Sequence, residues 1–155
     1  MDCSNCCPCL PVVEGCCFCH SLETGTKLIA IFEIVYNLAL IASEGTLMAY
    51  LPTIGQASAG FDVLLDVMMV VASVLLLIAL NNKMMELVNL WLVCEFIFII
   101  SGAIHCFALM VELLLGHLPK KIGSLFLLFH VLNEVLSSYF FIVVYNYYQE
   151  EFINP

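Results

Sequence analysis

Long apolar stretches, separated by short polar or turn-forming segments, divide the chain into four candidate helices. The stretches cover residues 28–50, 61–80, 87–115 and 122–145. Each is close to or above the roughly 20 apolar residues that a helix needs to cross a hydrocarbon core about 30 Å thick. We expect helices because lipid offers backbone groups no external hydrogen-bond partner, and the short alternating strands typical of a membrane barrel are absent from this pattern.

The segments between the stretches are short, which places sequence neighbours antiparallel. The pattern therefore predicts an all-α membrane protein, a four-transmembrane-helix up-down bundle with both termini on one side. Two tails remain, a cysteine-rich segment at residues 1–27 and a brief segment at 146–155. The start lacks a positively charged region, so we expect no cleavable signal peptide and a first span that acts as its own insertion signal.

Composition supports this architecture and excludes some partners. Apolar residues make up 63% of the 155 residues, charged residues 11%, and the net charge is −9. A soluble domain of this size could not hide so much apolar surface. The positive residues are Lys27, Lys83, Lys120 and Lys121. So few cations argue against nucleic acid and against a polybasic patch that binds anionic lipid.

The lysines do not decide the orientation, because each side of the membrane would receive two of them. The N-terminal cysteines favour cytosolic termini, since a cluster of thiols beside a membrane suits a reducing compartment. The cluster consists of Cys3, Cys6, Cys7, Cys9, Cys16, Cys17 and Cys19, followed by His20. Covalent palmitate on the cysteines nearest the membrane is the preferred interpretation. The alternatives are a zinc site that includes His20, and disulfides in the opposite topology.

Polar residues inside the predicted spans are the unusual chemistry of the chain. They are Glu33, Asn37, Glu44, Glu95, His105, His130 and Glu134. Charged groups at the centre of a bilayer cost about 3 kcal/mol or more, so each is a candidate functional residue. The favoured interpretation is hydrogen bonding between helices, and the alternative is a proton or cation path.

Other residues in the spans have simpler expected roles. Asp62 and Asp66 would lie in the first turns of the second span, where an acidic residue caps a helix favourably. Cys94 and Cys106 are expected to be small buried hydrophobic residues. Ser101-Gly102-Ala103 offers a surface for close helix packing. The chain shows no nucleophile elbow, HExxH sequence or phosphate-binding loop, so we expect a protein that is not an enzyme and needs no cofactor.

One segment resembles a known family. Residues 16–26, CCFCHSLETGT, lead directly into the first span. This resembles the start of the first helix in the lysosome-associated four-transmembrane family, and in particular its short insect relatives, the pasiflora-type septate-junction proteins. Thr24 and Thr26 could cap the helix that Leu28 opens, with Gly25 forming the turn.

The resemblance implies two cellular roles. The lysosomal members carry Pro-Pro-x-Tyr motifs in the C-terminal tail, and residues 145–155 contain none. This favours the pasiflora type, which implies a membrane organiser at lateral plasma-membrane junctions that contributes to the epithelial or glial barrier. Its expected partners are lipid and other membrane proteins in the plane of the bilayer. The alternative is an endosomal or lysosomal adaptor, or a proton-coupled transporter subunit that uses the intramembrane Glu and His residues.

Overall fold

The structure is a computed structural model in which residues 21–48, 53–116 and 120–153 are described. These residues form α1 (Leu22–Met48), α2 (Thr53–Asn82), α3 (Met85–Leu114) and α4 (Lys120–Tyr148), followed by a single π-helical turn, η1 (Gln149–Ile153). Within the described part of the chain, four helices are long and apolar enough to cross a membrane. The predicted all-α four-helix membrane fold is therefore confirmed.

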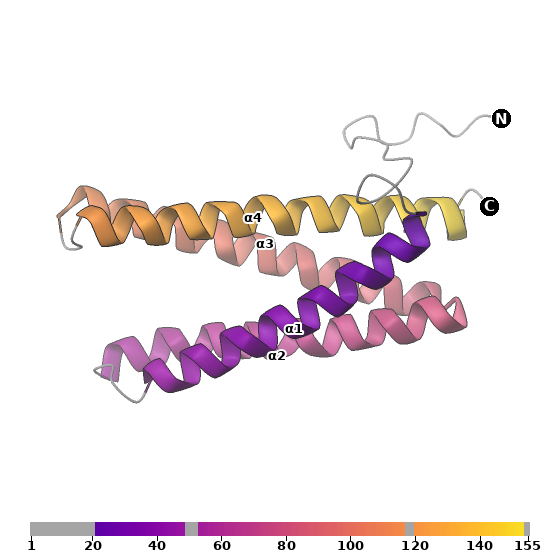
Figure 1. Cartoon of the computed structure of the whole chain (residues 1–155), viewed down its shortest axis with the longest axis horizontal. Helices are drawn as coiled ribbons and strands as arrows, with labels where there is room; N and C mark the ends of the chain where they lie inside the picture. Colours follow the sequence, from indigo (N-terminus) through magenta and orange to yellow (C-terminus); the bar gives the residue numbers. More distant parts are fainter. Residues whose placement is uncertain (1–20, 49–52, 117–119, 154–155) are drawn as a thin grey trace.

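Successive helices run in opposite directions, so the bundle has two distinct ends (Figure 1). The start of α1, the α2–α3 connection and the end of α4 lie together at what we call the terminus end. The other helix ends lie at what we call the loop end. α1 packs most extensively on α2, whereas its contact with α4 is much smaller. The α1–α2 and α3–α4 hairpins consequently separate toward the loop end.

Apolar packing concentrates in the half of the bundle next to the terminus end. The largest fully buried apolar side chains there include Trp91, Met69, Leu76, Val88 and Val143. All four helices contribute to this core, which also contains small residues such as Ala30 and Ala79. Because the opposite half lacks an equivalent apolar core among the described residues, the two halves of the interior differ in chemistry.

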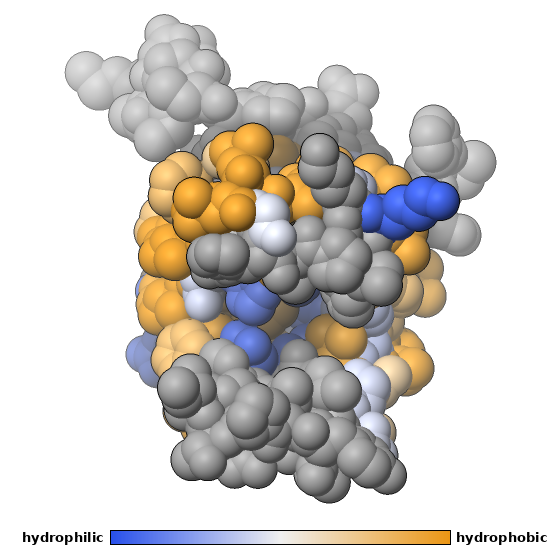
Figure 2. Space-filling view, turned by 90° about the vertical axis from the view of Figure 1, so that its left-hand side faces the viewer, coloured by the Kyte–Doolittle hydropathy of each residue, from blue (hydrophilic) through white to orange (hydrophobic). Residues whose placement is uncertain are grey.

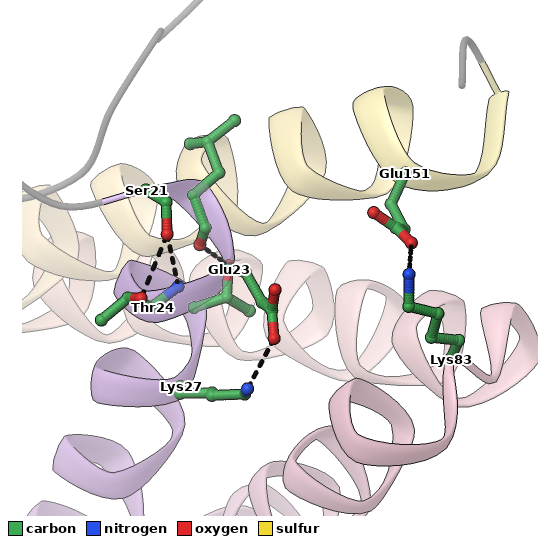
Figure 3. Close-up of polar contacts among 8 residues, drawn as sticks. Ser21, Glu23, Thr24, Lys27, Lys83 and Glu151 are labelled. Carbon is green, nitrogen blue, oxygen red and sulfur yellow. Dashed lines mark hydrogen bonds and ion pairs between the residues drawn. The ribbon is translucent and has the colours of Figure 1, made fainter.

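The first helix begins six residues before Leu28, and Ser21 is its N-cap (Figure 3). Ser21 Oγ accepts a hydrogen bond from the backbone N–H of Thr24 at 3.4 Å, as the N-cap position requires. Thr26 Oγ1 instead donates to the Leu22 carbonyl oxygen inside the helix at 2.8 Å. The prediction that Thr24 and Thr26 cap this helix is therefore wrong. The apolar pattern placed the start of this helix too late because its first turns lie at the membrane boundary, where residues need not be apolar.

A tight connection joins α2 to α3 at the terminus end. Lys83 has a left-handed backbone with φ of 52°, and the Met84 N–H bonds to the Ala79 carbonyl oxygen at 3.0 Å. This is the hydrogen bond of a Schellman C-cap, in which the residue after the helix takes the left-handed conformation. Lys83 Nζ also forms an ion pair with Glu151 of η1 at 2.5 Å (Figure 3). The pair ties the connection to the end of the chain's last helix.

α2 starts earlier than the sequence suggested. It begins at Thr53 and continues through residues 55–60, which lie between the first two predicted spans. The alanines in this segment favour a helix, and tertiary context commonly overrides glycine's weak helix propensity. Asp62 and Asp66 therefore lie several turns inside α2, and the prediction that they cap it is wrong. Asp66 is buried within the bundle, with 4% of its surface exposed.

Candidate functional site

A buried hydrogen-bonded group joins three helices at the centre of the bundle. Glu33 of α1 is 4% exposed. Its Oε2 atom accepts hydrogen bonds from Ser73 Oγ of α2 at 2.6 Å and from Trp91 Nε1 of α3 at 3.0 Å. The indole N–H also lies 3.3 Å from Ser73 Oγ. One carboxylate oxygen thus connects α1, α2 and α3, as expected for polar groups that hold helices together in lipid.

A second buried carboxyl group lies one turn further along α3. Glu95 is 1% exposed, and Ser137 of α4 hydrogen-bonds its side chain. This contact brings the fourth helix into the polar interior. The remaining Glu95 oxygen, Oε1, and the Asn37 Oδ1 atom are buried and have no hydrogen-bond partner among the described residues. Both residues line a small void of about 10 Å³, which is room for about one water molecule.

Toward the loop end, this void adjoins a much larger cavity, which we call the vestibule. Its volume is about 650 Å³, and all four helices contribute to its lining. The two spaces share Tyr36, Phe98 and Asn133 as wall residues. Figure 2 views the loop end, where hydrophilic side chains are visible in a hollow between the hairpins. The vestibule therefore opens at the loop end, and its inner limit is the buried carboxylate region.

Carboxylate and imidazole groups dominate the polar lining of the vestibule. They belong to Asp62 and Asp66 of α2, His105 of α3, and His130 and Glu134 of α4. The His105 and His130 rings are stacked, with centroids 4.7 Å apart and planes inclined by 25°. One turn separates His130 from Glu134, so both project into the same space. No lysine lines this cavity among the described residues.

The carboxyl group of Glu134 lies in space that is open only because Gly102 of the neighbouring helix has no side chain. A Cβ atom added to Gly102 of α3 would lie 1.6 Å from Glu134 Oε1. The carboxyl group thus occupies the space that any other residue at position 102 would fill. The close packing expected of the 101–103 segment occurs here as a contact between a glycine and an acidic side chain.

The structure divides the intramembrane polar residues into two groups. Glu33, Asn37 and Glu95 border the small void, whereas His105, His130 and Glu134 border the vestibule. Glu44 lies in α1, but its side chain is outside the described part of the structure. The proposed lipidation or metal residues, Cys3, Cys6, Cys7, Cys9, Cys16, Cys17, Cys19 and His20, also lie outside the described residues.

The two cysteines in the third span are half-buried free thiols, Cys94 and Cys106. The prediction that both are buried is therefore wrong, because neighbouring helices cover each side chain only in part. Within residues 21–48, 53–116 and 120–153, no three His, Cys, Asp or Glu side chains come together in a way that could hold a metal ion.

Sequence reasoning missed three important members of the polar interior. Ser73 lies in the middle of an apolar run and has no distinguishing neighbour. Trp91 is the only tryptophan of the chain, and its rarity was a usable signal because a buried indole N–H usually needs an acceptor. Asp66 was assigned a capping role because the start of α2 was placed too late.

The fold and its interior define a four-span integral membrane protein with a one-sided polar cavity. A family model described as "Domain of unknown function (DUF4728)" matches residues 63–151, which is more than half of the chain. The chain therefore belongs to this family. The match covers Ser73, Trp91, Glu95 and Glu134 but not Glu33, which lies before it. No curated protein and no solved structure matches the chain.

Proposed function

We propose that this protein is a non-enzymatic membrane organiser that contacts other membrane proteins within the bilayer. Its site of action is the lateral plasma membrane, where it contributes to septate-junction assembly and to the epithelial or glial barrier. The resemblance of residues 16–26 to pasiflora-type proteins supports the cellular role. Palmitate on the N-terminal cysteines would hold that tail at the membrane surface.

The observation that carries this proposal is the unequal burial of the helices. Only 11% of the most apolar part of the α3 span and 17% of that of α4 are buried inside the bundle, against 33% for α1 and 39% for α2. The outer face of the α3–α4 hairpin is rich in large side chains, including Phe96, Ile104, Phe107, Leu132 and Val135. Such a face suits contacts with the helices of a partner, because helices associate in lipid through close van der Waals packing.

The interior chemistry supports the same role. Glu33, Ser73 and Trp91 satisfy one another and join α1, α2 and α3. This arrangement uses polar groups to fix the position of helices. The apolar packing at the terminus end also interrupts the polar interior, so the described side chains provide no continuous polar route across the bundle. Both features favour a structural role over transport.

The first experiment is imaging of the tagged full-length protein in a polarised insect epithelium, with junctional and lysosomal markers. We expect signal at the lateral junction and leakage of a small dye across the epithelium after knockdown. Rescue with Ile104→Ala/Phe107→Ala, two exposed residues of α3, should restore protein abundance but not the barrier. Rescue with Ile31→Ala/Val35→Ala, which alters the exposed face of α1, is the matched control and should restore both. Signal confined to acidic vesicles would contradict the proposal.

A second candidate function is an acid-dependent transporter subunit of endosomes or lysosomes. The vestibule favours it, because Asp62, His105, His130 and Glu134 line a space that opens at one end of the bundle. Reconstitution of the full chain in liposomes tests this function directly. A pH-driven flux that Glu134→Gln abolishes, with unchanged junctional assembly in cells, would replace the organiser proposal.

A further inference from the structure

We propose that the vestibule binds a small organic cation, a protonated amine that enters from the loop end. This inference goes beyond the organiser function and does not depend on it. Its basis is the lining of the 650 Å³ cavity, which lies within the range of about 300–1,000 Å³ typical of small-molecule sites.

Charge selects a cation as the ligand. Three carboxyl groups, those of Asp62, Asp66 and Glu134, line the vestibule together with two histidines. No lysine belongs to the described lining. An anion would meet these carboxyl groups without a fixed positive partner, and a ligand ammonium group would offset part of their charge. Attraction of this kind is strengthened where protein and lipid exclude water.

Aromatic rings select an organic cation over a bare metal ion. Tyr36, Phe98 and Phe129, one each from α1, α3 and α4, form part of the wall. An ammonium group over an aromatic face is attracted by the negative face of the ring, more strongly where it is desolvated. A metal ion instead needs several ligand atoms at fixed short distances, and the described residues bring no three His, Cys, Asp or Glu side chains together in that way.

Unused hydrogen-bond acceptors at the inner limit of the vestibule are an independent observation. Glu95 Oε1 and Asn37 Oδ1 are buried without a partner among the described residues, and their void shares walls with the vestibule. Buried polar atoms are normally satisfied, so such acceptors indicate a missing donor. An ammonium group has only donor hydrogens, and a single water in the void can carry a hydrogen bond from it to these oxygens.

The experiment compares two probes of nearly the same shape and different charge. The full-length protein in lipid nanodiscs is titrated with 2-phenylethylamine, which is protonated at pH 7, and with neutral 2-phenylethanol. Binding is measured by equilibrium dialysis and by saturation-transfer NMR. We expect saturable binding of the amine and at least tenfold weaker binding of the alcohol. Equal binding of both probes would overturn the proposal, because the cavity would then recognise shape alone.

Variants locate the binding within the vestibule. Asp62→Asn/Glu134→Gln removes two charges at nearly constant volume and should weaken amine binding at least tenfold. Glu86→Gln, an exposed carboxylate at the terminus end, is the matched control and should bind like the wild type. Ser101→Leu fills part of the cavity and keeps every carboxylate, so it should also abolish binding and remains informative if the double variant does not fold. Unchanged binding in the folded double variant or in Ser101→Leu would disprove the site.

Discussion

The carboxyl group of Glu134 lies where a side chain on Gly102 would have to be, because a Cβ atom built at Gly102 falls 1.6 Å from Glu134 Oε1. The two residues belong to α3 and α4, which pack as a hairpin. A residue without a side chain on one helix thus leaves the space that an acidic group on the other occupies. The contact combines two requirements, close packing of helices and placement of charge in the vestibule.

Gly102→Ala should displace the Glu134 carboxyl group, and the cost should be small because that group is the far end of a flexible side chain beside the vestibule. We expect a loss of less than about 1 kcal/mol of unfolding free energy, below the cost of additions to a rigidly packed interior. Glu134→Ala should remove that cost when the two substitutions are combined, since the methyl group then has space. Gly45→Ala is the control, because an added Cβ meets nothing within 4 Å there. That helical substitution should stabilise by about 0.5–1 kcal/mol. SDS titration in mixed micelles measures all four, and additive effects at positions 102 and 134 would contradict the contact.

Trp91→Phe tests the buried group around Glu33. The substitution keeps an aromatic ring but removes the N–H that donates to Glu33 Oε2 at 3.0 Å. Glu33 Oε2 keeps the hydrogen bond from Ser73, so the variant loses one hydrogen bond and unfolding free energy should fall by about 0.5–1.5 kcal/mol. In a Glu33→Met background there is no carboxylate to satisfy, and the same substitution should cost much less. A cost that is equal in both backgrounds would show that the indole contributes only through packing.

Glu95→Gln should be tolerated, although Glu95 is 1% exposed. The amide retains an oxygen acceptor for Ser137 and removes a carboxyl group from a site with an unpartnered Oε1 atom. Burying a carboxylate is expensive, so we expect an unfolding free energy equal to or above that of the wild type. Ser137→Ala, by contrast, removes a donor and should cost about 1–3 kcal/mol. A large loss in Glu95→Gln would mean that the carboxylate itself is required for folding.

The ion pair between Lys83 and Glu151 predicts a pH dependence at high pH. The Glu151 carboxylate accepts a hydrogen bond from Lys83 Nζ and raises the pKa of this lysine above its ordinary value of 10.5. The folded-state pKa is higher than the unfolded-state pKa, so the pair stabilises fully below the unfolded value and its contribution is lost as pH rises through the folded value. The melting temperature of Lys83→Met should therefore differ from that of the wild type at pH 7–9 and should begin to converge with it only as pH rises above about 10.5.

This difference should be small and should decrease with salt, because the pair is exposed to solvent. A difference between Lys83→Met and the wild type that persists unchanged at the highest pH would mean that the substitution acts through the left-handed backbone at position 83. Lys83→Gly separates the two effects. It removes the same ion pair but favours the conformation with positive φ.

The four-helix bundle could be predicted from the sequence because hydrophobic length is a strong signal in a chain that spans lipid. The same reasoning found Glu33, Glu95 and Glu134, since an acidic residue within an apolar run is conspicuous. It failed where the signal is local and weak. Ser21 and Thr24 are equally suitable N-cap residues by type. Only the position of the first turn of α1 decides which of them is the N-cap.

The partners of the acidic residues were beyond sequence reasoning. Ser73 contacts Glu33 because α1 and α2 pack in one particular rotation, and neither residue's neighbours specify that rotation. The vestibule was equally unpredictable. It exists because the two hairpins separate toward the loop end, a property of packing angles to which all four helices contribute.

The apolar core at the terminus end has a consequence for anything that occupies the vestibule. A solute that enters through the loop end meets Met69, Leu76 and Trp91 beyond the carboxylates, so it must return by the way it came. Occupancy of the vestibule at equilibrium then depends on the concentration of the solute in the compartment that the loop end faces. The concentration of the solute on the other side of the membrane has no effect on it. Reversing the protein's orientation in the bilayer would leave its fold unchanged, but the vestibule would then open to the compartment on the opposite side of the membrane.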